Sequence, residues 1–161
     1  MSISEIEMKY KYQAGKMKCY FAHPYESRNS PEEKEILKEL KSRRIIVINP
    51  FDGEDEMMLK EYGRTSYYPD PPYELGRKIW AQDLRHVAEC DMIVVYVPDG
   101  SRLSGGCGIE MFHAYQLHKF IQIISKSKHP AFAWVLTGSN QMYESIDDWK
   151  KFRQLKWRSD S

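Results

Sequence analysis

Short apolar runs alternate with amphipathic stretches along this chain. The runs at residues 45–48 and 92–97 are continuous rather than alternating with polar residues, and turn-forming residues follow both of them. Runs of this length and character are typical of strands that are buried on both faces of a parallel sheet. Five strands are therefore predicted, over residues 17–22, 45–48, 92–97, 120–124 and 133–136.

The stretches between these runs have the residue spacing of helices. Ser30 is placed as an N-cap before Pro31, and acidic residues follow in the first turn. Helices are predicted over residues 31–43, 73–89, 111–119 and 146–157. Strands alternating with helices predict an α/β fold, namely a single-domain, doubly wound, flavodoxin/Rossmann-like five-stranded parallel sheet with helices on both faces.

The strand order expected for such a fold is 2-1-3-4-5, which brings the carboxyl ends of the first and third strands together. Residues 20–28 and 99–110 are therefore expected to meet at one edge of the sheet. Residues 1–16 are polar and are predicted to form a poorly ordered arm ahead of a domain over residues 17–161. Residues 53–72 are predicted to form a long loop that acts as a lid, carrying or bordered by Tyr62, Tyr67, Tyr68 and Tyr73.

The glycine-rich turn over residues 104–110 joins the strand at 92–97 to the helix predicted at 111–119. Glu110 is expected in the first turn of that helix, where the helix dipole favours its ionised form. An ionised glutamate there would act as a nucleophile or bind sugar hydroxyls, and on the motif alone a capping glutamate is an equal alternative. Cys107 lies in the same turn, where a helix N-terminus lowers a thiol pKa, although no general base for it is apparent.

Composition narrows the function classes. Charged residues make up 29% of the 161 residues and the formal net charge is +1, so neither a nucleic acid nor a membrane is implied as a partner. Three widely separated cysteines make neither a disulfide framework nor a zinc pattern. His113 and His118 have no metal-ligand spacing, so no metal is predicted. The polar start and the lack of a long apolar run favour a cytoplasmic protein.

An ordered set of short motifs resembles the nucleoside 2-deoxyribosyltransferase family, which includes nucleoside 5'-monophosphate N-glycosidases. The set comprises residues 19–22 (Cys-Tyr-Phe-Ala), residues 49–51 (Asn-Pro-Phe), Asp83 followed by Cys90 and Asp91, and the glycine turn that ends at Glu110. The resemblance covers roughly residues 17–125, and no cofactor is implied by it.

The resemblance implies roles for individual residues. Glu110 matches the nucleophile that attacks the anomeric carbon, Asp83 the carboxylate near the scissile bond, and Tyr20 the aromatic residue beside nucleophile and sugar. The same comparison places further residues against the base, sugar or phosphate, namely Ala22, His23, Arg28 and Phe51. It also implies a homodimer or higher oligomer, in which a partner residue from the region of Ser125 or residues 136–140 completes each site.

One position departs from the transferases of the family. They commonly have an aspartate six residues before the nucleophile, and this chain has Ser104 there. A hydroxyl followed by Gly105, Gly106 and Gly108 at a helix N-terminus predicts an anion site, because backbone N–H groups attract a phosphate that a carboxylate would repel. The serine therefore favours a nucleotide N-glycosidase over a transferase, with a nucleoside or nucleotide as the small-molecule substrate.

Other interpretations stay open at this point. On the residues alone, Asp83 is also interpreted as a solvated acid on a helix and Tyr20 as a core residue. His23 is then a loop histidine bonded to the backbone, and Asp91 is a structural turn residue. A nucleotide-binding sensor without turnover and an NAD-cleaving glycohydrolase are alternative functions for such a fold. No G-x-G-x-x-G follows the first strand, which argues against a dinucleotide reductase.

Overall fold

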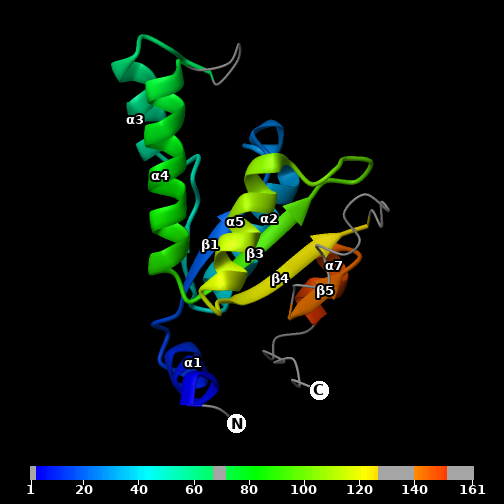
Figure 1. Cartoon of the computed structure of the whole chain (residues 1–161). Coiled ribbons are helices and arrows are strands. Elements are labelled where there is room, and N and C mark those ends of the chain that lie inside the picture. The colour runs from blue at the N-terminus through cyan, green and yellow to red at the C-terminus, as the bar shows by residue number, and fades with distance from the viewer. Residues whose placement is uncertain (1–2, 67–71, 127–139, 152–161) are drawn as a thin grey trace.

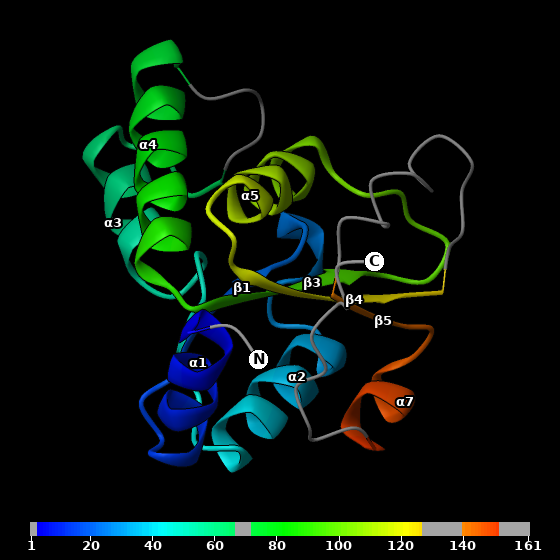
Figure 2. The same ribbon diagram turned by 60° about the horizontal axis from the view of Figure 1, so that its bottom comes forward.

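The computed structural model describes residues 3–66, 72–126 and 140–151, and within them one parallel sheet lies between two layers of helices (Figures 1 and 2). The strand order is β2-β1-β3-β4-β5 and every pairing is parallel, which confirms the predicted order and α/β class. The strands are β1 (Lys18–Ala22), β2 (Ile46–Ile48), β3 (Met92–Val97), β4 (Phe120–Ser125) and β5 (Gln141–Tyr143).

Helices cover both faces of this sheet. Figure 2 shows α4 and α5 on one face and α2 and α7 on the other, while α3 lies beside α4. The helices that the described residues form are α1 (Ile3–Gln13), α2 (Pro31–Ser42), α3 (Glu54–Glu61), α4 (Tyr73–Glu89), α5 (Gly105–Gln116) and α7 (Ile146–Lys151). None of them is both long enough and apolar enough to cross a bilayer.

The pleat of the central strands divides the core into two halves. Along β1, Tyr20 and Ala22 pack with residues of α4 and α5, whereas Cys19 and Phe21 pack with residues of α2 and α7. Side chains of a strand point alternately to its two faces, so one pentapeptide supplies both halves of the core. β3 and β4 are buried along their whole length, as the continuous apolar runs predict.

Several elements differ from the sequence-based prediction. Residues 3–13 form α1, and Met8 and Tyr12 pack against the core on the α2 side, so a poorly ordered arm is wrong for this segment. The predicted lid contains α3, because Leu59 packs against Leu75 and Ile79 of α4. β2 is an edge strand with Ile46 half exposed, and not a strand buried on both faces.

The carboxyl-terminal part of the sheet also differs. The predicted strand at 133–136 lies outside the described residues, and the edge position beyond β4 is taken by β5. The predicted last helix begins at Ile146 as expected, and its continuation beyond residue 151 lies outside the described residues. Trp149 of α7 is fully buried and donates its indole N–H to Gln122 Oε1 at 3.0 Å, which ties α7 to β4.

Asp91 is structural, as the sequence suggested, but it does not cap a helix. Its carboxylate accepts from the backbone N–H of Lys18 at 2.9 Å and from Lys11 Nζ at 2.8 Å. The side chain thereby joins the start of β3 to β1 and to α1. This bond gives α1 a specific attachment that the polar composition of the segment does not reveal.

Candidate active site

α5 begins earlier than its apolar pattern suggested. Ser104 is its N-cap, and the serine Oγ accepts from the backbone N–H of Cys107 at 3.2 Å. The helix therefore starts at Gly105, and Glu110 lies in its second turn rather than its first. A serine cap supplies a partner for an otherwise unbonded first-turn N–H group, which is enough to start a helix within a glycine-rich segment.

Glu110 is bonded to Tyr20 of β1. The Tyr20 hydroxyl donates to Glu110 Oε1 at 2.9 Å, and the tyrosine ring itself is fully buried in the core on the α4 side. A phenol held rigidly by packing fixes the orientation of the carboxylate that accepts its hydrogen bond. Tyr20 is therefore both a core residue and a direct partner of Glu110.

The pKa of Glu110 is raised to about 7: burial raises it most, the Tyr20 hydrogen bond partly offsets this, and the nearby Asp55 carboxylate adds a smaller increase. The expectation that the helix dipole would favour the ionised form is wrong for this residue. The dipole acts over the first turn of a helix, whereas the cost of burying a charge applies wherever water is excluded. Cys107 likewise has a raised thiol pKa, chiefly because it is buried.

Asp83 of α4 is the second acid of the cluster. Burial, followed by the charges of Asp55 and Glu110, raises its pKa to about 8, and the Tyr20 hydroxyl lowers it. Its Oδ1 atom is buried and has no hydrogen-bond partner among the described residues. A carboxyl group in this state is protonated at neutral pH and has a proton to donate.

Asp55 is the residue of this cluster that the sequence analysis missed. It lies in the first turn of α3, is 2% exposed, and its charge raises the pKa values of Asp83, Glu110 and Tyr20. Gln82, the neighbour of Asp83, donates from Nε2 to Glu54 Oε2 at 2.6 Å and so holds the start of α3 against α4. The sequence places Asp55 among other acids in an expected loop, so only its burial distinguishes it.

A pocket of about 300 Å³ opens beside these acids, between α4 and α5. Asp83 and Glu110 lie on its wall, and Trp80 and Ile109, each about half exposed, stand at its rim. On each helix the lining residues are three or four positions apart or adjacent to such positions, so they lie on one face of that helix. This spacing is the feature by which the sequence could have indicated the pocket. The lining residues are Gly76, Ile79, Trp80 and Asp83 on α4, and Gly106, Ile109 and Glu110 on α5.

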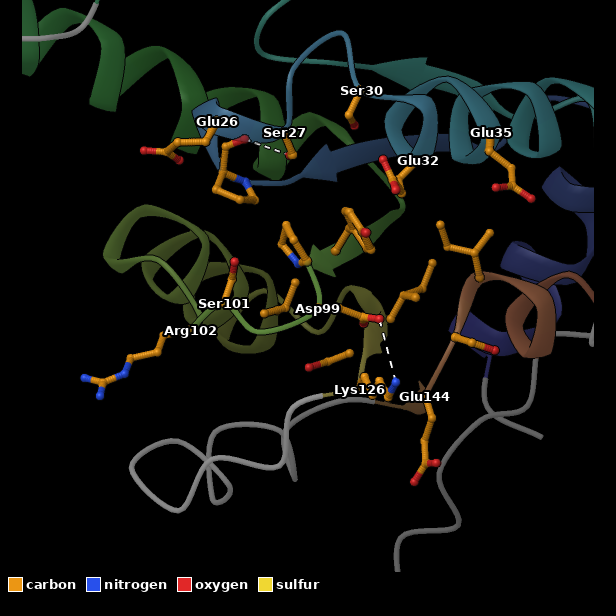
Figure 3. A pocket seen from close by; sticks show the side chains of 18 of the residues that line it. Glu26, Ser27, Ser30, Glu32, Glu35, Asp99, Ser101, Arg102, Lys126 and Glu144 are labelled. Carbon is orange, nitrogen blue, oxygen red and sulfur yellow. Dashed lines mark hydrogen bonds and ion pairs between the residues drawn. The ribbon is translucent and has the colours of Figure 1, made fainter.

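A larger cavity of about 910 Å³ lies on the other side of Ser104, at the carboxyl ends of β1, β3 and β4 (Figure 3). Its described lining carries seven carboxylates and only two cationic side chains, Arg102 and Lys126. We call it the acid-lined cavity. Its charge opposes an anion on this side of Ser104, in contrast to the first-turn N–H groups of α5, which attract one.

His23 belongs to a separate internal network. Its ring is 3% exposed, with Nδ1 at 2.8 Å from Ser27 Oγ and Nε2 at 3.0 Å from Asn49 Oδ1 and 3.2 Å from Glu33 Oε2. Burial is the largest influence and lowers its pKa. Both ring nitrogens are thus occupied within the protein, and the structure does not bring His23 into the Tyr20–Glu110 arrangement.

The other residues expected around a substrate lie near His23 and Tyr25, in the core, and at the start of α5. Phe51 packs edge-on against His23, and the Arg28 guanidinium lies 3.9 Å from the centre of the Tyr25 ring. Ala22 is fully buried in the core on the α4 side, so its side chain is not on a cavity wall. Gly105 and Gly106 are exposed at the start of α5, where a Cβ would meet nothing within 4 Å, and Gly108 is half-buried beside Leu103.

Two further expectations concern a partner subunit and a metal. Ser125 is buried at the end of β4, and residues 136–139 lie outside the described part of the chain. Within the described ranges no three histidine, cysteine or acidic side chains are grouped closely enough to hold a metal ion.

Comparison with solved structures identifies the fold. A 2-deoxyribosyltransferase from Bacillus psychrosaccharolyticus superposes with a TM-score of 0.59 at 17% identity, over 88% of this chain and 99% of that one. The fold is that of a deoxyribosyltransferase. The CMP N-glycosidase BcmB of Clostridium botulinum is also similar, with a TM-score of 0.50 at 16% identity, over 83% of this chain and 95% of that one. No protein-family model and no curated protein sequence matches this chain.

The resemblance inferred from the motifs is thus confirmed by the fold of both enzymes. At such low identity the deoxyribosyltransferase likeness fixes the arrangement of strands and helices. What the site does has to be argued from its own residues.

Proposed function

We propose that this protein cleaves the N-glycosidic bond of a (deoxy)nucleoside or (deoxy)nucleoside 5'-monophosphate through a covalent glycosyl-glutamate. The proposal is carried by one observation: Glu110 accepts a hydrogen bond from Tyr20 at 2.9 Å, while the carboxyl group of Asp83 is buried on the same pocket wall. Two carboxyl groups with separate roles are what retaining glycoside cleavage requires. The two similar structures, of a deoxyribosyltransferase and a CMP N-glycosidase, support the same chemistry.

In the first step the ionised Glu110 attacks the anomeric carbon. The bond between that carbon and the base nitrogen breaks, its electron pair goes to the base, and the Asp83 carboxyl group delivers the proton that the leaving base needs. The pKa values support Glu110 as the nucleophile and Asp83 as the proton donor, because the pKa is about 7 for Glu110 and about 8 for Asp83. Near neutral pH a substantial fraction of molecules has Glu110 ionised and Asp83 protonated.

In the second step the glycosyl-glutamate ester is resolved. Water attacks the anomeric carbon, its proton goes to the Asp83 carboxylate, and Glu110 is released as a carboxylate. A second base in place of water would give transfer instead of hydrolysis. The apolar walls of the pocket, formed in part by Ile79, Trp80 and Ile109, suit a flat base.

We favour hydrolysis of a nucleotide over base transfer because of the residue at position 104. Ser104 leaves the start of α5 without a carboxylate, and Gly105 and Gly106 expose backbone there. First-turn N–H groups attract a phosphate. The acidic side chains of the neighbouring cavity act against phosphate binding, so the contribution of Ser104 has to be tested separately from that of Glu110.

The decisive experiment is a chromatographic assay of the protein against nucleosides, their 5'-monophosphates and NAD, with and without a second free base. We expect free base plus sugar phosphate from monophosphates, and we expect Glu110→Gln to lower turnover on the order of a thousandfold or more because the nucleophile is lost. Trp80→Phe serves as a matched pocket variant that keeps both carboxyl groups.

Each outcome of this assay has a clear meaning. Full activity of the Glu110→Gln variant would remove Glu110 from the mechanism. Exchange of bases on unphosphorylated deoxynucleosides would make the protein a transferase. Nicotinamide release from NAD alone would make it a glycohydrolase of that cofactor, and binding of nucleotides without turnover would make it a sensor.

A further inference from the structure

The hydroxyl of Tyr96 in β3 has no hydrogen-bond partner within residues 3–66, 72–126 and 140–151. Its ring packs in the core on the α2 side, the residue is 7% exposed, and it lines the acid-lined cavity. No described residue forms a hydrogen bond with its hydroxyl, although buried polar groups are nearly always bonded. An unbonded hydroxyl that faces a cavity is available to a ligand.

Carboxylates surround this hydroxyl. Burial, followed by the charges of Glu32, Asp99 and Glu35, raises the pKa of Tyr96 to about 12. Figure 3 shows Glu32 and Glu35 on α2, Asp99 after β3, and Glu144 before α7 around one space. The tyrosine therefore stays protonated and can both accept a hydrogen bond from a ligand and donate one to a carboxylate.

The cavity has more acceptors than its own cations satisfy. Its lining includes six serines in addition to the seven carboxylates. Lys150 pairs with Glu35, Lys151 pairs with Asp148 at 3.2 Å, and Lys126 lies 3.9 Å from Asp99 in an exposed and therefore weak pair. Arg102 points away from Glu32 and Asp99 (Figure 3). Among the described lining residues and their ion-pair partners a negative excess remains, which favours a cationic ligand.

The spacing of the acids distinguishes between kinds of cation. Within the described residues no three acidic or other metal-binding side chains converge as a metal site would require. The carboxylates are contributed by several separate elements around a volume of about 910 Å³. A divalent metal needs ligands at a single point, whereas an extended molecule with several ammonium groups meets such distributed charges one at a time.

We propose that the acid-lined cavity binds an organic polycation of the diamine or polyamine class, with one ammonium group donating to the Tyr96 hydroxyl and another pairing with carboxylates such as Glu32. The acid-lined cavity is separate from the pocket that holds Asp83 and Glu110, and the two share only their position on either side of the start of α5, where Ser104 lines the cavity. Amine binding through Tyr96 and Glu32 does not depend on the function proposed for that pocket.

Calorimetric titration of the protein with spermidine at low ionic strength tests whether the acid-lined cavity binds a polyamine. We expect saturable one-to-one binding that is at least about tenfold tighter than binding of butylamine, because a second ammonium group adds charged pairs. Magnesium chloride at matched ionic strength is the second comparison. Absence of saturable spermidine binding, or equally tight binding of magnesium or butylamine, would overturn the proposal.

Variants locate the bound amine. Tyr96→Phe and Glu32→Gln are each expected to weaken spermidine about fivefold, which corresponds to one hydrogen bond or ion pair. Glu7→Gln, which removes an exposed carboxylate of α1, is the matched control and should bind as the parent protein does. Glu110→Gln should also retain binding, whatever its effect on turnover.

Thermal unfolding of each variant shows whether it is folded. If Tyr96→Phe does not fold, Glu32→Gln on the exposed side of α2 carries the test alone. Wild-type affinity in the folded variants, or equal weakening in Glu7→Gln, would show that spermidine responds to the overall charge of the protein and that the cavity is not its site.

Discussion

At the residue scale, three carboxyl groups and one phenol form an electrostatically coupled cluster in which Asp55 is buried and Asp83 and Glu110 are partly buried. Asp55, Asp83 and Glu110 each affect the charge of another, and the Tyr20 hydroxyl lowers the pKa of Asp83 and Glu110. In such a cluster the measured pKa values belong to the group as a whole. The roles of the acids are set by their surroundings: Glu110 Oε1 accepts from Tyr20 at 2.9 Å, whereas Asp83 Oδ1 is buried with no partner among the described residues.

The pH dependence of kcat/KM tests this coupling. We expect a bell-shaped profile with limbs near pH 7 and pH 8, because Glu110 must be ionised and Asp83 protonated. Asp55→Asn removes a charge that raises both pKa values, so both limbs should move to lower pH by about half a unit to one unit. Tyr20→Phe removes a bond that lowers them, so the acidic limb should move to higher pH.

The opposite directions of these two shifts make the prediction specific. Glu56→Gln, an exposed acid of the same first turn of α3 as Asp55, is the control and should leave both limbs in place. Limbs that stay unchanged in Asp55→Asn would mean that Asp55 has no electrostatic part in the site.

At the scale of elements, the start of α5 lies between the two cavities, and Ser104 both begins the helix and lines one of them. Ser104 caps the helix by accepting from Cys107 N, and it lines the acid-lined cavity while Gly106 lines the pocket between α4 and α5. Its structural and binding roles therefore need separate variants. Aspartate is as good an N-cap as serine, and alanine is a poor one.

We expect Ser104→Ala to lower the free energy of unfolding by about 1 kcal/mol, and Ser104→Asp to leave it nearly unchanged. Ser104→Asp should lower kcat/KM for a nucleoside monophosphate by about tenfold or more relative to the nucleoside, since its carboxylate repels phosphate. Thermal unfolding and parallel assays on the two substrates measure both effects.

The matched control is Ser30→Ala, which removes the equivalent cap of α2, where Ser30 Oγ accepts from Glu33 N at 3.1 Å. It should lower stability similarly and leave the ratio of the two activities as it was. An unchanged ratio in Ser104→Asp as well would show that no phosphate lies near Ser104.

At the scale of the whole molecule, the buried acids destabilise the fold as pH rises. The pKa of Asp83 is about 8 in the folded protein against 3.8 for the ordinary group. A raised folded pKa contributes stability that is present below the unfolded value and is lost as pH rises through the folded one. The free energy of unfolding should therefore fall between about pH 4 and pH 8.

Asp83→Asn cannot ionise and should lack this decline. Solvent relaxation around the partly buried group reduces the effect of the pKa shift. We therefore expect the free energy of unfolding of wild type to fall by on the order of 2 kcal/mol more than that of Asp83→Asn between pH 5 and pH 8, or about 5 °C in Tm. Denaturant unfolding at both pH values measures it, with Glu89→Gln, an exposed acid at the end of the same helix, as control. Equal losses in wild type and Asp83→Asn would contradict the raised pKa.

The order of the strands and the meeting of the β1 and β3 ends followed from the sequence itself. The continuous apolar run at residues 92–97 predicted a strand buried on both faces, and β3 is buried along its whole length. The shorter run at 45–48 also formed a strand, but its position at the sheet edge leaves Ile46 half exposed. Predictions failed where a weak local signal was overruled by packing. Residues 3–13 became helical because Met8 and Tyr12 reach the core, and Asp91 fastens the segment through Lys11.

The same distinction applies to the candidate site. In the sequence, the glycine turn pointed to Glu110, and the resemblance to the deoxyribosyltransferase family pointed to Tyr20 and Asp83 and to the chemistry of all three. Only the tertiary structure brought Asp55 beside them and moved the start of α5 ahead of Glu110. Protonation depends on burial and on neighbouring charges, which are properties of the folded chain and are absent from any local stretch of it.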